Sequence, residues 1–175
     1  MAEQISMNPA RILSWFLPAL LAVCAALIAN LPVSLTGGLV PSPVLALAPI
    51  YFWTLVRPDL MPPAAVLTIG LLEDLLSGGP PGLWAAGFLA AFTLADRQRD
   101  VFAGLAGTGA VFGFAASMFT ASAIVFVLVI VVLGTLPPLA PIFLQATVSV
   151  ILYPLLAVLM GWVHRHWIGA QRGDE

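Results

Sequence analysis

Charged residues are scarce in this chain. Only 8% of its 175 residues are Asp, Glu, Lys or Arg, and lysine is absent altogether. A soluble domain has about 25% charged residues, whereas here 61% of the residues are apolar. We therefore expect a membrane protein. Because a spanning helix needs about 20 apolar residues, the length suits a single integral membrane domain over residues 1–175.

Other absences narrow the classes of function. Cys24 is the only cysteine, which excludes an intrachain disulfide and a cysteine-based metal cluster. The net charge of -2, without a basic run, gives no footprint for nucleic acid. No nucleophile elbow, phosphate-binding glycine loop or Cys–His pairing is evident. His164 and His166 are two residues apart and do not share a helix face. We predict a non-enzymatic protein without cofactor or metal.

Six apolar runs, separated by Pro, Gly or charged clusters, predict an all-α polytopic membrane protein. The third and fourth runs are short for a full crossing, which predicts a steep or partly interfacial pair, and the fifth is long, which predicts a strongly tilted helix. A fifth helix broken between Gly104 and Gly113 is the competing interpretation. The first run is expected to stay as an uncleaved helix, because no small-x-small exit follows it. The predicted helices cover approximately residues 13–31, 40–56, 62–76, 83–95, 102–133 and 140–162.

The arginines predict the orientation of these helices. Short cytoplasmic loops collect Lys and Arg during insertion. With six helices every arginine falls on one side, and the three connections on the other side carry no charge. Both termini are therefore expected in the cytoplasm. The residues concerned are Arg11, Arg57, Arg97, Arg99, Arg165 and Arg172.

The acidic pair Glu73-Asp74 lies inside the third apolar run. An ionisable side chain costs about 2.5 to 3.5 kcal/mol at a bilayer centre, so such residues usually face a protein interior, water or a partner. Gly70 and Asp74 share a helix face, and Glu73 is rotated by about 100 degrees. Since Gly70 permits close helix approach, we expect Asp74 to bond to donors on another helix or chain. For Glu73, hydration, protonation and hydrogen bonding remain open.

Small residues cluster at two further places. The segment Ser77 to Gly82 holds three glycines and two prolines and predicts a tight turn between helices. Gly109, Gly113 and Ala116 repeat at helical spacing in the fifth run. Such a stripe lets another backbone approach closely. Packing within the bundle is favoured for it, and a homodimer surface is the alternative.

One segment of the chain resembles a known family. It contains Tyr51-Phe52-Trp53, then Arg57-Pro58, and then the run from Gly70 to Gly82, in which Gly-x-x-x-Asp precedes a Gly-Pro-x-Gly turn. This combination resembles the rod-shape-determining membrane proteins of the MreD family. The match lies between Pro49 and Leu94, while the remaining helices agree in hydropathy and number.

The resemblance implies a multi-pass protein of the bacterial inner membrane, in the machinery that controls cell shape and peptidoglycan synthesis. Its implied partner is an MreC-like bitopic membrane protein. Through that partner it would be linked to MreB-like filaments, a RodA-like glycosyltransferase and the associated penicillin-binding transpeptidase. The family is similar in helix arrangement to the substrate-binding subunits of vitamin importers.

The matching residues become candidates for structural or partner-binding roles: Arg57, Pro58, Gly70, Asp74, Gly79, Pro80 and Gly82. A second hypothesis is a small-molecule binding or transport subunit, in which Glu73 and Asp74 reach into a solute cavity. Asn30, Gln145 and a few Ser or Thr residues are nearly the only other polar side chains that such a cavity could use.

Overall fold

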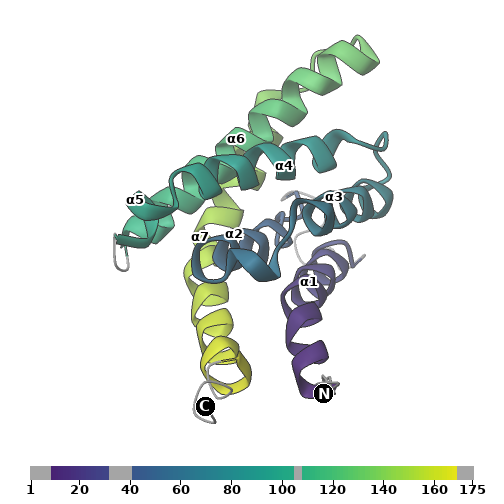
Figure 1. Cartoon of the computed structure of the whole chain (residues 1–175). Helices are drawn as coiled ribbons and strands as arrows, with labels where there is room; N and C mark the ends of the chain where they lie inside the picture. The colour runs from purple at the N-terminus through teal and green to yellow at the C-terminus, as the bar shows by residue number, and fades with distance from the viewer. Residues whose placement is uncertain (1–8, 32–40, 105–107, 169–175) are drawn as a thin grey trace, which may run out of the picture.

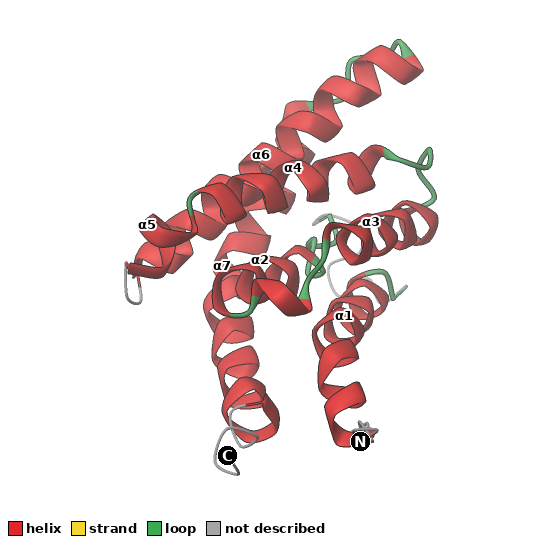
Figure 2. Ribbon diagram, in the orientation of Figure 1, coloured by secondary structure: helices red, strands yellow, loops and turns green. Residues whose placement is uncertain are grey.

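The computed structural model describes residues 9–31, 41–104 and 108–168, and this part of the chain is helical, without strands (Figures 1 and 2). The elements in chain order are α1 (Pro9–Ala29), α2 (Leu47–Val56), the short 3-10 helix η1 (Pro58–Leu60), α3 (Pro63–Ser77), α4 (Leu83–Arg97), α5 (Arg99–Gly104), α6 (Thr108–Leu133), α7 (Leu139–Val163) and the π-helical turn η2 (His164–Ile168).

The helices predicted at 13–31, 62–76, 83–95 and 140–162 correspond to α1, α3, α4 and α7. The second predicted helix begins later than expected, at Leu47. Pro41 and Pro43 precede it and have no backbone N–H to donate to a helix. Residues 41–44 are instead irregular, and the backbone N–H of Val44 donates to the Ser149 hydroxyl on α7.

A continuous fifth helix over 102–133 is wrong, and the broken alternative is right. The helix α5 ends at Gly104 and α6 begins at Thr108, while residues 105–107 lie outside the described chain. Glycine is a poor helix former, and residues 104, 107 and 109 are all glycine. The break lets α5 pack against α2 and α4 while α6 runs back along α4 (Figure 1).

Two helices of the described chain are long and apolar enough to cross a membrane, α6 and α7 with its extension to His166. With 15 residues each, α3 and α4 measure about 22 Å at 1.5 Å per residue, less than a hydrocarbon core of ~30 Å. The structure therefore supports two candidate spans. The six-span count and the orientation remain predictions.

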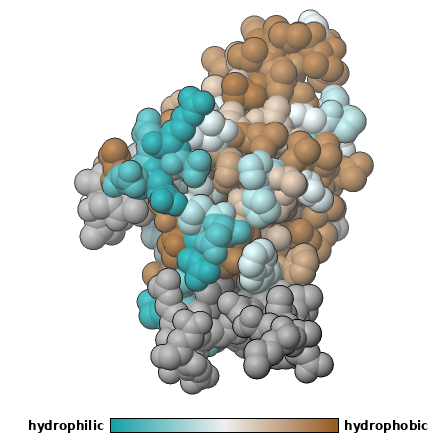
Figure 3. All heavy atoms as spheres, in the orientation of Figure 1, coloured by the Kyte–Doolittle hydropathy of each residue, from teal (hydrophilic) through white to brown (hydrophobic). Residues whose placement is uncertain are grey.

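Both long helices expose most of their surface. Only 22% of the most apolar window of α6 and 17% of that of α7 are buried, unlike the core helix of a soluble protein. No residue between Ala123 and Gln145 is buried. The corresponding part of the molecule projects beyond the other helices in Figure 1 and is mostly apolar in Figure 3. An apolar surface of this extent is typical of contact with a membrane or a partner.

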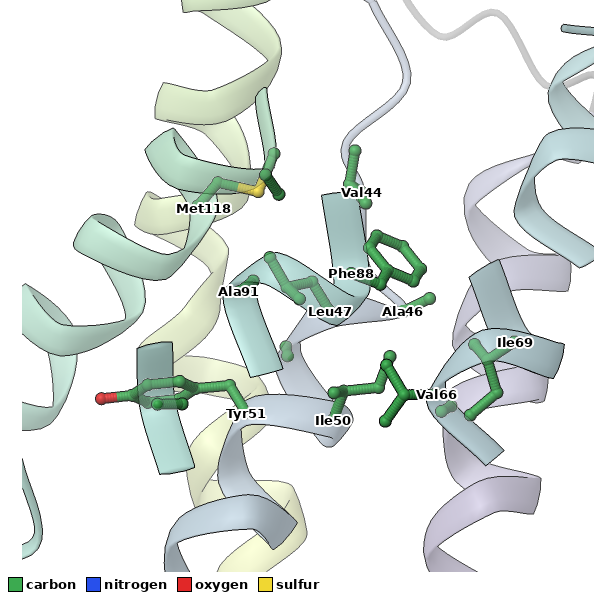
Figure 4. Close-up of a cluster of buried hydrophobic side chains, with 14 of the residues drawn as sticks. Val44, Ala46, Leu47, Ile50, Tyr51, Val66, Ile69, Phe88, Ala91 and Met118 are labelled. Carbon is green, nitrogen blue, oxygen red and sulfur yellow. The ribbon is translucent and has the colours of Figure 1, made fainter. Parts of the chain in front are cut away.

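The packed core is built around α2, most of whose residues are buried. Tyr51 contacts the rings of Phe114 on α6 and Tyr153 on α7, and these two rings stack at a centroid distance of 4.2 Å. Tyr51 lies in the same cluster as Ile50, Leu47 and their apolar neighbours from α3, α4 and α6 (Figure 4). In a membrane such contacts stabilise the bundle through van der Waals packing rather than through removal of water.

Candidate functional site: the α3–α4 hairpin

Asp74 joins α3 to the start of α4. Its Oδ2 accepts a hydrogen bond from the backbone N–H of Gly82 at 2.7 Å, and its Oδ1 accepts one from Trp84 at 2.7 Å. A longer contact of 3.4 Å joins Oδ2 to the Ala85 N–H. The side chain is only 1% exposed. Both carboxylate oxygens are thus occupied by backbone donors that the first turn of a helix leaves unpaired.

Asp74 lies between two helix ends of opposite polarity. The carboxylate lies near the C-terminal end of α3, where the helix dipole disfavours negative charge. It lies at the same time at the N-terminal end of α4, where the dipole favours an anion. The predicted hydrogen bonds to another helix are therefore present, with donors from the next helix of the same chain.

Two glycines make the turn between these helices. Gly78 ends α3 with a φ of 69°, and its N–H donates to the backbone oxygen of Asp74. Gly82 precedes α4 with a φ of 105°. Side chains other than glycine rarely adopt such positive φ values. The two positions reverse the chain and bring the backbone N–H groups of α4 back over Asp74.

Gly70 sets the distance between α3 and α4. A Cβ atom added at Gly70 would lie 2.4 Å from the Cα and 2.9 Å from the N of Ala85. Backbone atoms at that distance cannot be moved by a rotamer change, so only glycine permits this approach. Gly70 and Asp74 thus act on the same first turn of α4, one by packing and the other by hydrogen bonding.

Glu73 faces α1 instead. Its Oε1 accepts a hydrogen bond from the Asn30 side-chain amide at 3.0 Å, and the same amide donates to the Ala26 carbonyl at 2.9 Å. Glu73 is 4% exposed, and its Oε2 has no hydrogen-bond partner among the described residues. Of the three alternatives, the structure shows a hydrogen-bonded and buried side chain, and it places the two acids in different environments.

The remaining motif residues occupy two ends of α3. Arg57 and Pro58 precede its start, and Arg57 forms a salt bridge of 2.8 Å with Asp59 that raises the pKa of the guanidinium. Gly79 and Pro80 belong to the turn at the other end. A Cβ at Gly79 would meet only the Ser77 hydroxyl, at 3.7 Å. The seven candidate residues therefore do not form one site.

The three small residues of the fifth predicted run differ in burial. Gly109 and Gly113 are buried, whereas Ala116 is exposed. The two glycines thus pack within the bundle, as favoured, and Ala116 remains available to lipid or another molecule.

The close approach of α4 to α6 at Gly87 was not predicted from the sequence. A Cβ atom added at Gly87 would lie 3.1 Å from the Ala121 carbonyl oxygen of α6. Gly87 and Ala91 are four residues apart, a small-xxx-small spacing that is typical of close helix packing, so the sequence did carry a signal for this contact.

Two polar side chains of α7 hold the segment that leads into α2. Gln145 donates to the Ser42 carbonyl at 2.8 Å. Ser149 accepts from the Val44 N–H at 2.9 Å and donates to the Gln145 carbonyl at 2.8 Å. Both side chains bind the protein's own backbone over a separation of more than 100 residues in sequence. Periodicity in the sequence could not identify such pairs.

Comparisons of the chain with protein-family models, with curated proteins and with solved structures gave no match.

Proposed function

We propose that this chain is an MreD-type scaffold of the bacterial inner membrane. It would bind an MreC-like bitopic partner and help to position peptidoglycan synthesis along the elongating cell. The observation that carries the proposal is the α3–α4 hairpin. Gly70, Asp74 and Gly82, which are part of the resemblance, act together on the first turn of α4. The motif residues therefore have a common physical role at the start of α4.

A six-span arrangement with both termini in the cytoplasm is part of this proposal. It is supported by the distribution of arginines and by the start of α1 and the end of α7, which lie at the same end of the molecule (Figure 1). Hydrophilic residues gather on the lower and left sides of Figure 3, and the projecting end of the molecule is apolar. In this arrangement α3 and α4 would require local thinning of the bilayer, because each is shorter than the hydrocarbon core.

The first test is to tag the protein at its C-terminus, crosslink mildly in native membranes and identify the copurified proteins by mass spectrometry. Recovery of an MreC-like bitopic protein with wall synthases supports the proposal. Recovery of an ATPase module or a defined solute, without wall-synthesis proteins, would replace the scaffold with the transport hypothesis.

The second test compares Asp74→Leu with Asp96→Leu in the same strain. Asp96 is exposed near the far end of α4, so its replacement removes an acid without touching the turn or the first turn of α4. We expect Asp74→Leu to lower the yield of the partner complex and to produce rounder cells, and Asp96→Leu to leave both unchanged. Normal cell shape and normal complex yield for Asp74→Leu would contradict the assigned role.

The alternative function, a small-molecule binding or transport subunit, has one observation in its favour. The Oε2 atom of Glu73 is buried without a hydrogen-bond partner in the described chain and could accept a bond from a solute. Asp74 offers no free oxygen for this purpose, since both are bonded to α4. Saturable binding of a solute that is lost in Glu73→Gln would favour this alternative.

A further inference from the structure

The buried residues of helix α1 are small. Its bulky side chains Trp15 and Phe16 are 60% and 67% exposed, while the buried residues follow one another at helical spacing: Pro18, Ala22, Ala26 and Ala29. The helix packs against α2, α3 and η1 at one edge of the molecule (Figure 1). Small residues let helices approach closely, but each contributes few side-chain contacts. A polar contact can therefore supply a large share of what holds α1 in place.

One polar contact joins the end of α1 to α3. Among the described residues, the bond from Asn30 Nδ2 to Glu73 Oε1, 3.0 Å long, is the side-chain hydrogen bond that links these helices. The same Nδ2 donates to the Ala26 carbonyl at 2.9 Å, which fixes the amide against the last turn of α1. The position of α1 and the environment of Glu73 are therefore linked.

The bond to Asn30 leaves Glu73 with one oxygen that has no partner. Glu73 is 4% exposed, and its Oε2 is buried without a hydrogen-bond partner among the described residues. Nor does a described basic side chain form a salt bridge with it. A buried carboxylate that is incompletely paired costs free energy, and the cost falls when the group is neutral. With α1 docked, a proton on Oε2 removes the buried charge and leaves the bond from Asn30 to Oε1 intact.

Neighbouring charged groups do not take the place of that proton. Asp74 is adjacent in sequence and adds charge of the same sign, and its own oxygens are bonded to α4. Cys24 on α1 is exposed. The other charged residues of the elements around Glu73 lie toward the opposite ends of those elements: Arg11 on α1, Arg57 and Asp59 before α3, and Asp96 and Arg97 on α4. Glu73 is therefore the group whose protonation acts directly on the contact between α1 and α3.

We propose that protonation of Glu73 controls the docking of α1. The neutral side chain holds the end of α1 through Asn30. When Oε2 loses its proton to water, the end of α1 separates from α3, and water reaches both carboxylate oxygens from the exposed turn that follows Ser77. The docked state binds one proton more than the separated state, so docking is favoured at low pH and is lost as the pH rises through the titration of Glu73. This device lies within the chain and is independent of any partner.

The test uses the natural cysteine. Cys24 is exposed on α1, and Thr93→Cys adds a second site on α4, at an exposed residue whose hydroxyl donates to Leu89 in the same helix. Spin labels on both sites report the distance between α1 and α4 by double electron–electron resonance. The full chain in phosphatidylcholine nanodiscs should be measured from about pH 4 to about pH 9. We expect the ratio of docked to separated chains to fall by up to about tenfold per pH unit.

Three variants in the same labelled chain identify the group responsible. Glu73→Gln cannot ionise and keeps the oxygen that accepts from Asn30, so it should remain docked over the whole range. Asp96→Asn is the matched control, because it removes an exposed acid at the far end of α4, and it should retain the wild-type pH dependence. Asn30→Ala removes the bond without removing the acid and should raise the separated fraction at low pH about threefold.

An unchanged distance distribution of the wild-type side chains over the whole pH range would overturn the proposal. The same pH dependence in Glu73→Gln would assign the change to another group, and loss of the pH dependence in Asp96→Asn would do so as well. An unchanged separated fraction in Asn30→Ala would show that the bond to Glu73 does not hold α1.

Discussion

Replacement of Asp74 by alanine should destabilise the protein more than any other change of a charged side chain in the hairpin. Asp74 makes two short hydrogen bonds of 2.7 Å to backbone N–H groups of Gly82 and Trp84. Hydrogen bonds to a charged group are worth about 1.5 to 3 kcal/mol each. Those measured within membranes are weaker, so we take the lower value. The expected loss in free energy of unfolding is about 3 kcal/mol.

Asparagine at this position should have about half of that effect. Its single carbonyl oxygen can keep one of the two bonds, while its NH₂ group would face the other N–H donor. We expect Asp74→Asn to lose about 1.5 kcal/mol. The order wild type, Asn, Ala would separate hydrogen bonding from packing, because Asn and Asp have nearly the same volume.

The measurement is SDS titration of the purified protein in mixed micelles, followed by circular dichroism. Asp96→Ala is the control, because Asp96 is exposed on α4 and such surface changes usually stay within about 0.5 kcal/mol. A loss below about 1 kcal/mol for Asp74→Ala, or an equal loss for Asp96→Ala, would refute the idea that this carboxylate holds the start of α4.

Three further predictions use the same unfolding assay. Gly70→Ala should lower the free energy of unfolding by about 1 to 3 kcal/mol, because its Cβ would lie 2.4 Å from the Cα of Ala85. Gly79→Ala is the control and should change the free energy of unfolding little, because the new Cβ has room there. Equal losses for the two variants would contradict the packing argument. Ser149→Ala should cost about 1 to 3 kcal/mol, because it leaves a buried backbone N–H without its acceptor; an unchanged midpoint would show that this bond contributes nothing. Glu73→Gln should preserve or raise stability, since it keeps the oxygen that binds α1 and removes a buried charge whose second oxygen is unpaired; a loss above about 1 kcal/mol would reveal an undetected donor at that oxygen.

Several features followed from the sequence because they depend on local chemistry. The apolar runs between Pro, Gly and charged clusters give the approximate position of α1, α3, α4 and α7. The turn between Ser77 and Gly82 followed from residues that allow positive φ or interrupt a helix. Helical spacing placed Gly70 and Asp74 on one face. These inferences need only neighbours within a few residues of one another.

Tertiary structure decided which atoms meet. The sequence could not show that the N–H groups of α4 would satisfy Asp74, since that depends on the path of the turn. Nor could it show that Glu73 meets Asn30, or that Ser149 holds the entry to α2 from 105 residues away. Such contacts depend on where helices lie relative to one another. The long helices α6 and α7 carry apolar residues on nearly all sides. That pattern is typical of membrane helices, but it does not indicate which face meets protein and which meets lipid.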